Sequence, residues 1–175
     1  SDVERLYNQH WAHFDEQWWK NEFGRGHARR ERRDILLSIW LTAVTGEEAN
    51  VRHLYLQARE FVAKSPSIEQ VIEEIHAFAD AYRTIYDQNA PIDPAVKIAY
   101  KRIQSVGINT ALPLLTWLRT LSQELLDARD HRRAVQAVES WALRRAFTNR
   151  DTRGYGAHLA RVLREARRAG ATGHH

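Results

Sequence analysis

Arginine is concentrated between residues 129 and 168, where 11 Arg face only four acidic residues, Asp130, Glu139, Asp151 and Glu165. Guanidinium groups at this density can neutralise nucleic-acid phosphates and release their counterions, and they also suit docking onto an acidic protein surface. A plain solvated helix surface is the alternative. The candidate contacts to DNA backbone or to a neighbouring domain are Arg144, Arg145, Arg150, Arg153, Arg161, Arg164 and Arg168.

The arrangement of these arginines favours contacts to the nucleic-acid backbone over contacts to the bases. Arg161, Arg164 and Arg168 follow one another at intervals of three and four residues, which predicts a single stripe on the last helix. No aromatic or Asn/Gln set stands among the arginines to read base edges. We therefore expect contacts to phosphates rather than sequence-specific base reading.

Two spacings that contain histidine resemble parts of metal sites. Glu73 and His76 have the Glu-x-x-His spacing of a di-iron site in a helical bundle, but such a site needs a second copy of the motif and two further Glu. His10 and His13 lie one turn apart with no acidic or histidine partner evident. We expect these side chains to be exposed or hydrogen-bonded rather than to bind a metal.

No sequence motif proposes an active site in this chain. There is no Gly-rich phosphate loop, no Gly-x-Ser-x-Gly elbow, and no readable Ser/His/Asp order. The absence of Cys excludes a thiolate nucleophile, a disulfide framework and iron–sulfur or Cys-based zinc sites. We therefore predict no catalytic, cofactor-binding or metal residue here.

An aromatic cluster near the N-terminus admits two interpretations. It comprises Trp11, Phe14, Trp18, Trp19, Phe23 and Trp40. The rings could form a stacking platform for bases. Most of them fall on the apolar faces of predicted helices, however, so core packing is the favoured interpretation. Trp19 cannot fully share the face of Trp18, so we expect it to be partly exposed or buried against another domain.

Composition indicates one folded domain. A chain of 175 residues with 43% apolar and 27% charged residues can bury a hydrophobic core. Residues 1–90 hold 11 basic and 15 acidic residues, a net charge of −4, whereas residues 91–175 hold 15 and 7, a net charge of +8. No apolar run approaches the roughly 20 residues of a membrane span, and no signal peptide leads the chain. These features favour a cytoplasmic protein without a membrane partner.

Apolar periodicity predicts an all-α fold of about eight helices, an irregular bundle without a sheet. The expected helices cover residues 3–20, 28–45, 51–63, about 67–88, 94–107, 113–126, 130–147 and 157–169. Asn50, Ser67, Asp93 and Asp130 are the expected N-caps, and Gly46 is an expected stop. The helix over 28–45 is apolar nearly all round and should therefore be central.

The ends of the chain suggest an excised piece of a larger protein. There is no Met, and Gly173 is followed by two His that read as a tag remnant. We expect one helical domain over residues 2–170, with a possible seam near 89–94, and a tail over 171–175.

The order of sequence landmarks resembles a known family. The landmarks are residues 10–14, 33–41, 51–55, 59–61, 78–83, 138–145 and 152–155. Together they look like the central helical region of DUF262/DUF1524 proteins, which include GmrSD-type modification-dependent restriction enzymes and related phage-defence nucleases. The resemblance spans roughly residues 3–168. Within it, Glu139, Ser140, Arg144 and Arg145 match a Glu-Ser-x-x-x-Arg-Arg segment of the family.

The resemblance implies a non-catalytic connecting role. In that family an Asp-Gly-Gln-Gln-Arg motif tied to nucleotide hydrolysis precedes this region, and a His-Asn-His-like metal-dependent nuclease site follows it; neither motif is present here. The nucleoside triphosphate and the divalent metal of such a parent would bind outside this chain. Its partners would be flanking domains of the same polypeptide and DNA. A free-standing nucleic-acid-binding domain and a protein-interaction scaffold, each using the basic half, remain as alternatives.

Overall fold

The protein is all-α apart from one very short pair of strands. The computed structural model describes residues 12–23, 29–148 and 154–172, with side chains up to residue 170. The α-helices in this part are α2 (Gln17–Lys20), α3 (Arg32–Thr45), α4 (Leu54–Lys64), α5 (Ile68–Tyr86), α6 (Pro94–Ser105), α7 (Leu112–Thr120), α8 (Ala128–Phe147) and α9 (Tyr155–Thr172). The short 3-10 helices are η1 (Ala12–Asp15), η3 (Val51–His53) and η4 (Asn109–Ala111).

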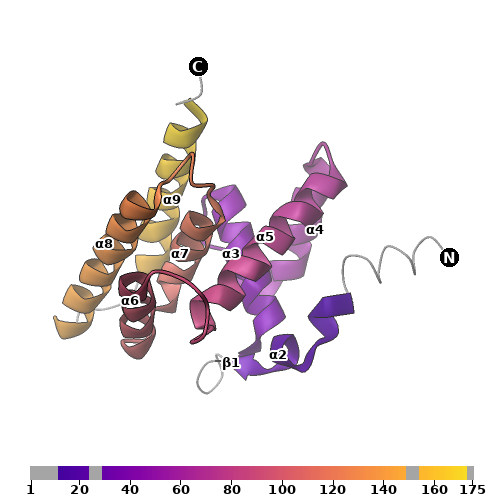
Figure 1. Ribbon diagram of the computed structural model, residues 1–175. Coiled ribbons are helices and arrows are strands. Elements are labelled where there is room, and N and C mark those ends of the chain that lie inside the picture. Colours follow the sequence, from indigo (N-terminus) through magenta and orange to yellow (C-terminus); the bar gives the residue numbers. More distant parts are fainter. Residues whose placement is uncertain (1–11, 24–28, 149–153, 173–175) are drawn as a thin grey trace.

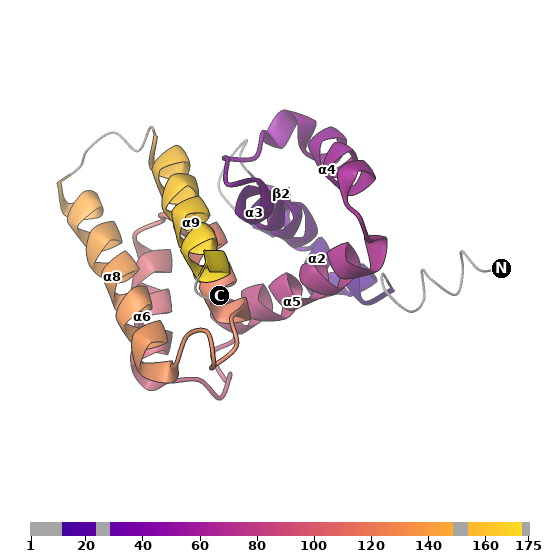
Figure 2. The same ribbon diagram turned by 90° about the horizontal axis from the view of Figure 1, so that it is seen from above.

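Helix α3 is the centre of the molecule, as its apolar sequence predicts. It packs against α2, α4, α5, α7 and α9, and its Trp40 is completely buried. Figures 1 and 2 show α4 at one end of the molecule and the α6–α8 pair at the other, with α3, α5 and α7 between them. One continuous cluster of buried apolar side chains extends from η1 to α9.

Local signals set several helix ends as predicted. The side chains of Asn50, Ser67 and Asp93 accept hydrogen bonds from backbone N–H groups two or three residues later, at the starts of η3, α5 and α6. Gly46 ends α3 in the left-handed conformation, with φ of 70°, and its N–H donates to the carbonyl of Thr42. These contacts satisfy backbone groups that a helix end would otherwise leave unpaired.

Helices α7 and α8 are among those whose boundaries differ from the sequence prediction. Helix α8 is capped by Asp127, whose carboxylate accepts from the N–H of Asp130 at 2.8 Å; Asp130 itself lies in the first turn. Helix α7 ends at Thr120 instead of continuing to residue 126, because Leu121 is extended with ψ of 139°. Leu125, which falls within the helix expected over 113–126, lies outside α7 and is 50% exposed.

The predicted helix over residues 3–20 is wrong in the part that the structure describes. Glu16 is extended, with ψ of 144°, and separates η1 from α2. Because of this break, Phe14 and Trp19 both reach the core, and Trp19 is only 1% exposed. It is Trp18, not Trp19, that lies half-buried at the surface, so the prediction for Trp19 is also wrong. Residues 3–11 of the predicted helix lie outside the described residues.

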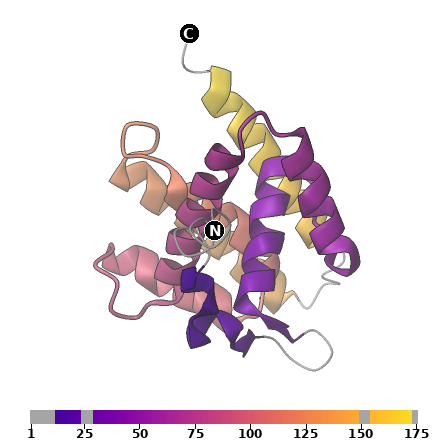
Figure 3. The same cartoon turned by 90° about the vertical axis from the view of Figure 1, so that its right-hand side faces the viewer.

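A two-stranded sheet replaces the start of the helix predicted over 28–45. Strands β1 (Glu22–Phe23) and β2 (Arg30–Glu31) pair antiparallel, with Glu22 opposite Glu31 and Phe23 opposite Arg30. Figure 3 shows them at the base of α3. Two residues per strand are too few for an alternating pattern to be visible in the sequence, so this short pair was not predicted, while the all-α class is confirmed. None of the described helices is long and apolar enough to cross a lipid bilayer.

Candidate nucleic-acid interface

Helices α8 and α9 bring the basic part of the chain together. Both pack against α7, and they run in opposite directions beside each other (Figures 1 and 2). Val135, Val138 and Ala142 bury the inner face of α8, while Leu159 and Leu163 bury that of α9. This packing directs the remaining faces of both helices, which carry most of the arginines, toward solvent.

Aromatic rings join the two helices at the end of α8. The ring of Trp141 on α8 meets that of Tyr155 edge-on, with centroids 5.2 Å apart. The ring of His158, one turn further along α9, lies 6.3 Å from Trp141 with the two planes 22° apart. Tyr155 is buried, Trp141 is half-buried and His158 is exposed. The rings therefore lead stepwise from the core to the surface.

Two of the predicted arginines extend this row of rings. The guanidinium of Arg145 lies over the ring of Tyr155, 5.5 Å from its centroid. A guanidinium nitrogen of Arg161 lies 3.3 Å from Nδ1 of His158. We call Trp141, Arg145, Tyr155, His158 and Arg161 the α8–α9 seam. Cation–π attraction holds the guanidinium of Arg145 in place over Tyr155.

Arg144 and Phe147 lie on the exposed side of α8, close in sequence to Arg145 of the seam. Arg144 is exposed and its Nε donates to the carbonyl of Ser140 at 3.2 Å. Phe147 is 85% exposed, more than any other large apolar side chain in the described residues. The two are three residues apart on one helix, which makes them neighbours on its surface.

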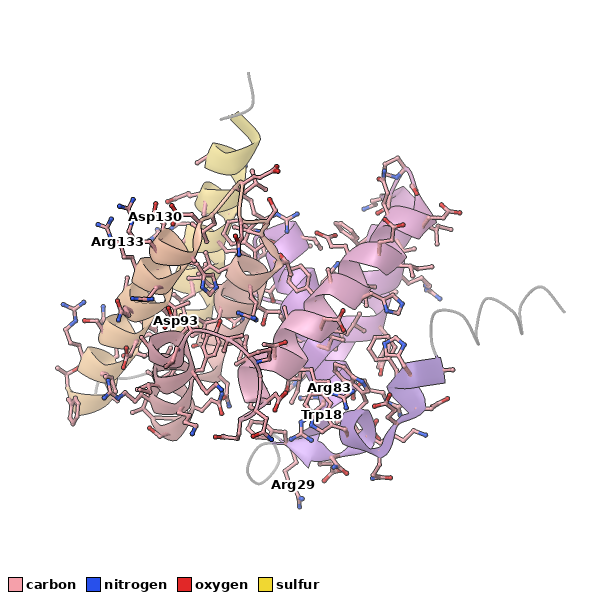
Figure 4. The ribbon with its side chains drawn as sticks, in the orientation of Figure 1. Trp18, Arg29, Arg83, Asp93, Asp130 and Arg133 are labelled. Atoms are coloured by element: carbon pink, nitrogen blue, oxygen red, sulfur yellow. The ribbon has the colours of Figure 1, made fainter. Side chains whose placement is uncertain are left out.

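Acidic partners divide the arginines of α8 into two groups. At its N-terminal end Arg129 pairs with Asp130, and Arg132 pairs with Asp93, the cap of α6. Arg133 also pairs with Asp130 (Figure 4). Among the described residues, by contrast, no carboxylate forms an ion pair with Arg144, Arg145 or Arg161. Arginines without a carboxylate partner among the described residues therefore include Arg144 and Arg145 near the C-terminal end of α8 and Arg161 on α9.

The stripe predicted on α9 is not uniform. Arg161 joins the seam and Arg168 is exposed, but Arg164 is half-buried because its stem packs over Gly46. A Cβ at Gly46 would lie 2.7 Å from the Cβ of Arg164, so glycine is needed there for the close approach as well as for its φ. Arg150 and Arg153 lie outside the described residues.

The N-terminal aromatic cluster is part of the core, as the packing interpretation predicts. Phe14, Trp19 and Trp40 are buried. The ring of Trp18 has the guanidiniums of Arg32 and Arg83 over it, at 4.4 and 5.2 Å from its centroid (Figure 4). The protein's own guanidinium groups thus already occupy the ring of Trp18. Trp11 lies outside the described residues.

The Glu73 and His76 spacing is not part of a metal centre among the described residues, where no three His, Asp or Glu side chains gather around one point; His10 lies outside the described residues. His13 instead packs against His76, with ring centroids 4.7 Å apart. Burial and the neighbouring His76 lower the pKa of His13. Glu74, rather than Glu73, makes the contacts that join helices: it accepts from the indole N–H of Trp40 and pairs with Arg167.

A wide groove of about 840 Å³ lies between α3 and the α6–η4 connection and reaches Gly156 at the start of α9. Ser38, Thr42 and Asn109 contribute polar groups to its lining, together with Glu48 beside Gly156. The lining carries both charge signs, with Glu22 and Arg30 at one edge. It therefore lacks the single-sign charge of the α8–α9 surface.

Comparison with known proteins assigns no function to the α8–α9 surface. No family model, curated protein or solved structure matches the chain. Sequence reasoning found Arg144, Arg145 and Arg161 but missed Tyr155 and His158 as their companions. The spacing of Tyr155 and His158 on one helix face was visible. Their position opposite Trp141 was not, because it depends on how α8 and α9 pack against α7.

Proposed function

We propose that this protein is the non-catalytic helical module of a cytoplasmic, modification-dependent restriction or phage-defence nuclease of the DUF262/DUF1524 type. In this role it connects a nucleotide-hydrolysing part to a nuclease part, and its α8–α9 surface holds the DNA backbone. The observation that carries the proposal is that Arg144 and Arg145 near the end of α8 and Arg161 on α9 have no carboxylate partner among the described residues. Part of the sequence resemblance to that family, residues 138–145, covers the same end of α8.

The charge distribution favours backbone contact over a purely structural role. Arg129, Arg132 and Arg133 already have acidic partners within the protein, and such exposed pairs add little stability. Arg144, Arg145 and Arg161 have none among the described residues, so a phosphate can bind them without first displacing a carboxylate. Binding of this kind is independent of base sequence and falls steeply with salt.

Charge reversal at Arg144 and Arg145 tests this function. We expect the Arg144→Glu/Arg145→Glu double variant to lose at least about tenfold in affinity for duplex DNA. We also expect its slope of log affinity against log salt to fall by about two, one for each lost phosphate contact. Fluorescence anisotropy between about 50 and 200 mM salt measures both quantities, in the range where phosphate contacts dominate.

Arg129→Glu/Arg133→Glu is the matched control, since it changes the net charge equally at the paired end of α8. It should keep most of the affinity. Equal losses in the two double variants would mean that overall charge alone drives binding. Affinity insensitive to salt and to both substitutions would contradict the proposal and favour a protein-interaction scaffold whose arginines dock an acidic domain.

The parent protein provides a second test. We expect the coding sequence that flanks this segment to encode an Asp-Gly-Gln-Gln-Arg motif upstream and a His-Asn-His-like motif downstream. Sequencing the open reading frame on both sides decides this. A frame with neither motif would leave a free-standing nucleic-acid-binding domain as the function.

A further inference from the structure

The α8–α9 surface carries aromatic groups that backbone binding does not use. Phe147 is 85% exposed beside Arg144, and His158 is exposed beside Arg161. A phenyl ring that is exposed to water beside an arginine gains free energy when a partner covers it. A partner with flat apolar faces and negative charge would cover Phe147 and His158 and also pair with the neighbouring arginines.

His158 is held in an orientation suited to stacking. Its ring lies nearly parallel to that of Trp141, which is itself fixed by the buried ring of Tyr155. The contact with Arg161, one turn further along α9, also restrains the ring of His158. The ring is thus placed in advance, so a base that stacks on it loses little binding energy to ordering the protein.

We propose, building on the function proposed above, that this surface binds single-stranded DNA. Unpaired bases stack on Phe147 and His158, while Arg144, Arg145 and Arg161 contact the phosphates between them. Single-strand binding sites combine a basic track with aromatic rings in this way. In a duplex the faces of the bases are covered by their neighbours, so Phe147 and His158 would gain nothing from paired DNA. An acidic peptide would likewise satisfy the arginines but offer no flat face to the rings.

A comparison of single-stranded and duplex DNA tests the proposal. The probes are a fluorescently labelled oligonucleotide of about 12 nucleotides, within the usual site size of such proteins, and the same strand annealed to its complement. We expect the wild-type protein to bind the single strand more tightly than the duplex. Phe147→Ala should weaken single-strand binding by at least about fivefold, the loss of one stacked base, and leave duplex binding and the salt slope unchanged.

Two matched variants separate stacking from general surface effects. Leu125→Ala removes another exposed apolar side chain, away from the seam, and should change neither affinity. His158→Phe should retain single-strand binding that His158→Ala loses, because the phenyl ring keeps the flat face. Circular dichroism should show unchanged folding, since Phe147 and His158 make few buried contacts.

The outcomes distinguish this inference from the proposed function. Equal affinity for both probes, together with no effect of Phe147→Ala, overturns single-strand binding. If charge reversal at Arg144 and Arg145 still weakens binding in that case, the backbone-binding function stands. Binding to neither probe overturns both.

Discussion

At the scale of single residues, burial determines which titratable side chains make the stability of the fold depend on pH. His131 lies in the first turn of α8, on the side that faces α6 and α7, and its Nε2 is buried without a hydrogen-bond partner in the described residues. Burial, and then the positive charge of Arg119, lower the pKa of His131 below the 6.5 of an unburied histidine, against the opposing effect of Asp93. The folded protein therefore favours the neutral imidazole.

The lowered pKa of His131 predicts a dependence of stability on pH. Below pH 6.5 the unfolded chain takes up a proton on this histidine before the folded protein does, so the free energy of unfolding decreases as the pH falls toward the folded-state pKa. Above pH 6.5 His131 is neutral in both the folded and the unfolded state, so its full contribution to the free energy of unfolding is present. We expect His131→Gln to remove this part of the pH dependence, measured by urea unfolding across the window. An unchanged slope in the variant would assign it to other groups.

At the scale of helices, short side chains at the ends determine where each helix begins. Asp127 and Asp130 are both three or fewer residues from the start of α8, and either could cap it by type. Asp127 is the cap because its carboxylate is the one that accepts from a free N–H of the first turn. Asp130 is left to pair with Arg129 and Arg133 on the surface.

This difference predicts unequal effects of two similar substitutions. Asp127→Ala should destabilise the protein by about 1 kcal/mol, because it leaves backbone donors of α8 without a partner. Asp130→Ala removes only exposed ion pairs and should cost less than about 0.5 kcal/mol. Thermal and urea unfolding of the two variants measure the contrast. A larger loss for Asp130→Ala would show that its surface charge network, not the cap, holds this end of α8.

At the scale of the whole molecule, α9 is attached to the rest of the fold by more than apolar packing. Leu159 and Leu163 are buried, the stem of Arg164 covers Gly46, and Arg167 reaches Glu74 on α5. Glu74 also accepts from the indole N–H of Trp40 at 3.3 Å. One half-buried carboxylate thus joins α3, α5 and α9.

The two contacts of Glu74 should contribute unequally to stability. Glu74→Ala leaves the indole N–H of the fully buried Trp40 without an acceptor and should cost about 1–3 kcal/mol. Glu74→Gln keeps an oxygen for Trp40 and loses only the pairing with Arg167, so we expect a cost under about 1 kcal/mol. Arg167→Ala is the complementary variant and should match Glu74→Gln. If Glu74→Gln proved as costly as Glu74→Ala in urea unfolding, the ion pair would be the dominant contact.

The sequence by itself determined the features that depend on neighbouring residues. Apolar periodicity specified the all-α class and the central position of α3, and Asn50, Ser67, Asp93 and Gly46 marked helix ends through contacts within a few residues. It also located the basic segment that includes Arg144, Arg145 and Arg161. Only the tertiary structure decided that Glu16 breaks the first helix, that Trp19 is buried and that Tyr155 and His158 stand opposite Trp141. These outcomes depend on how distant segments pack against one core, and no local pattern in the chain records that packing.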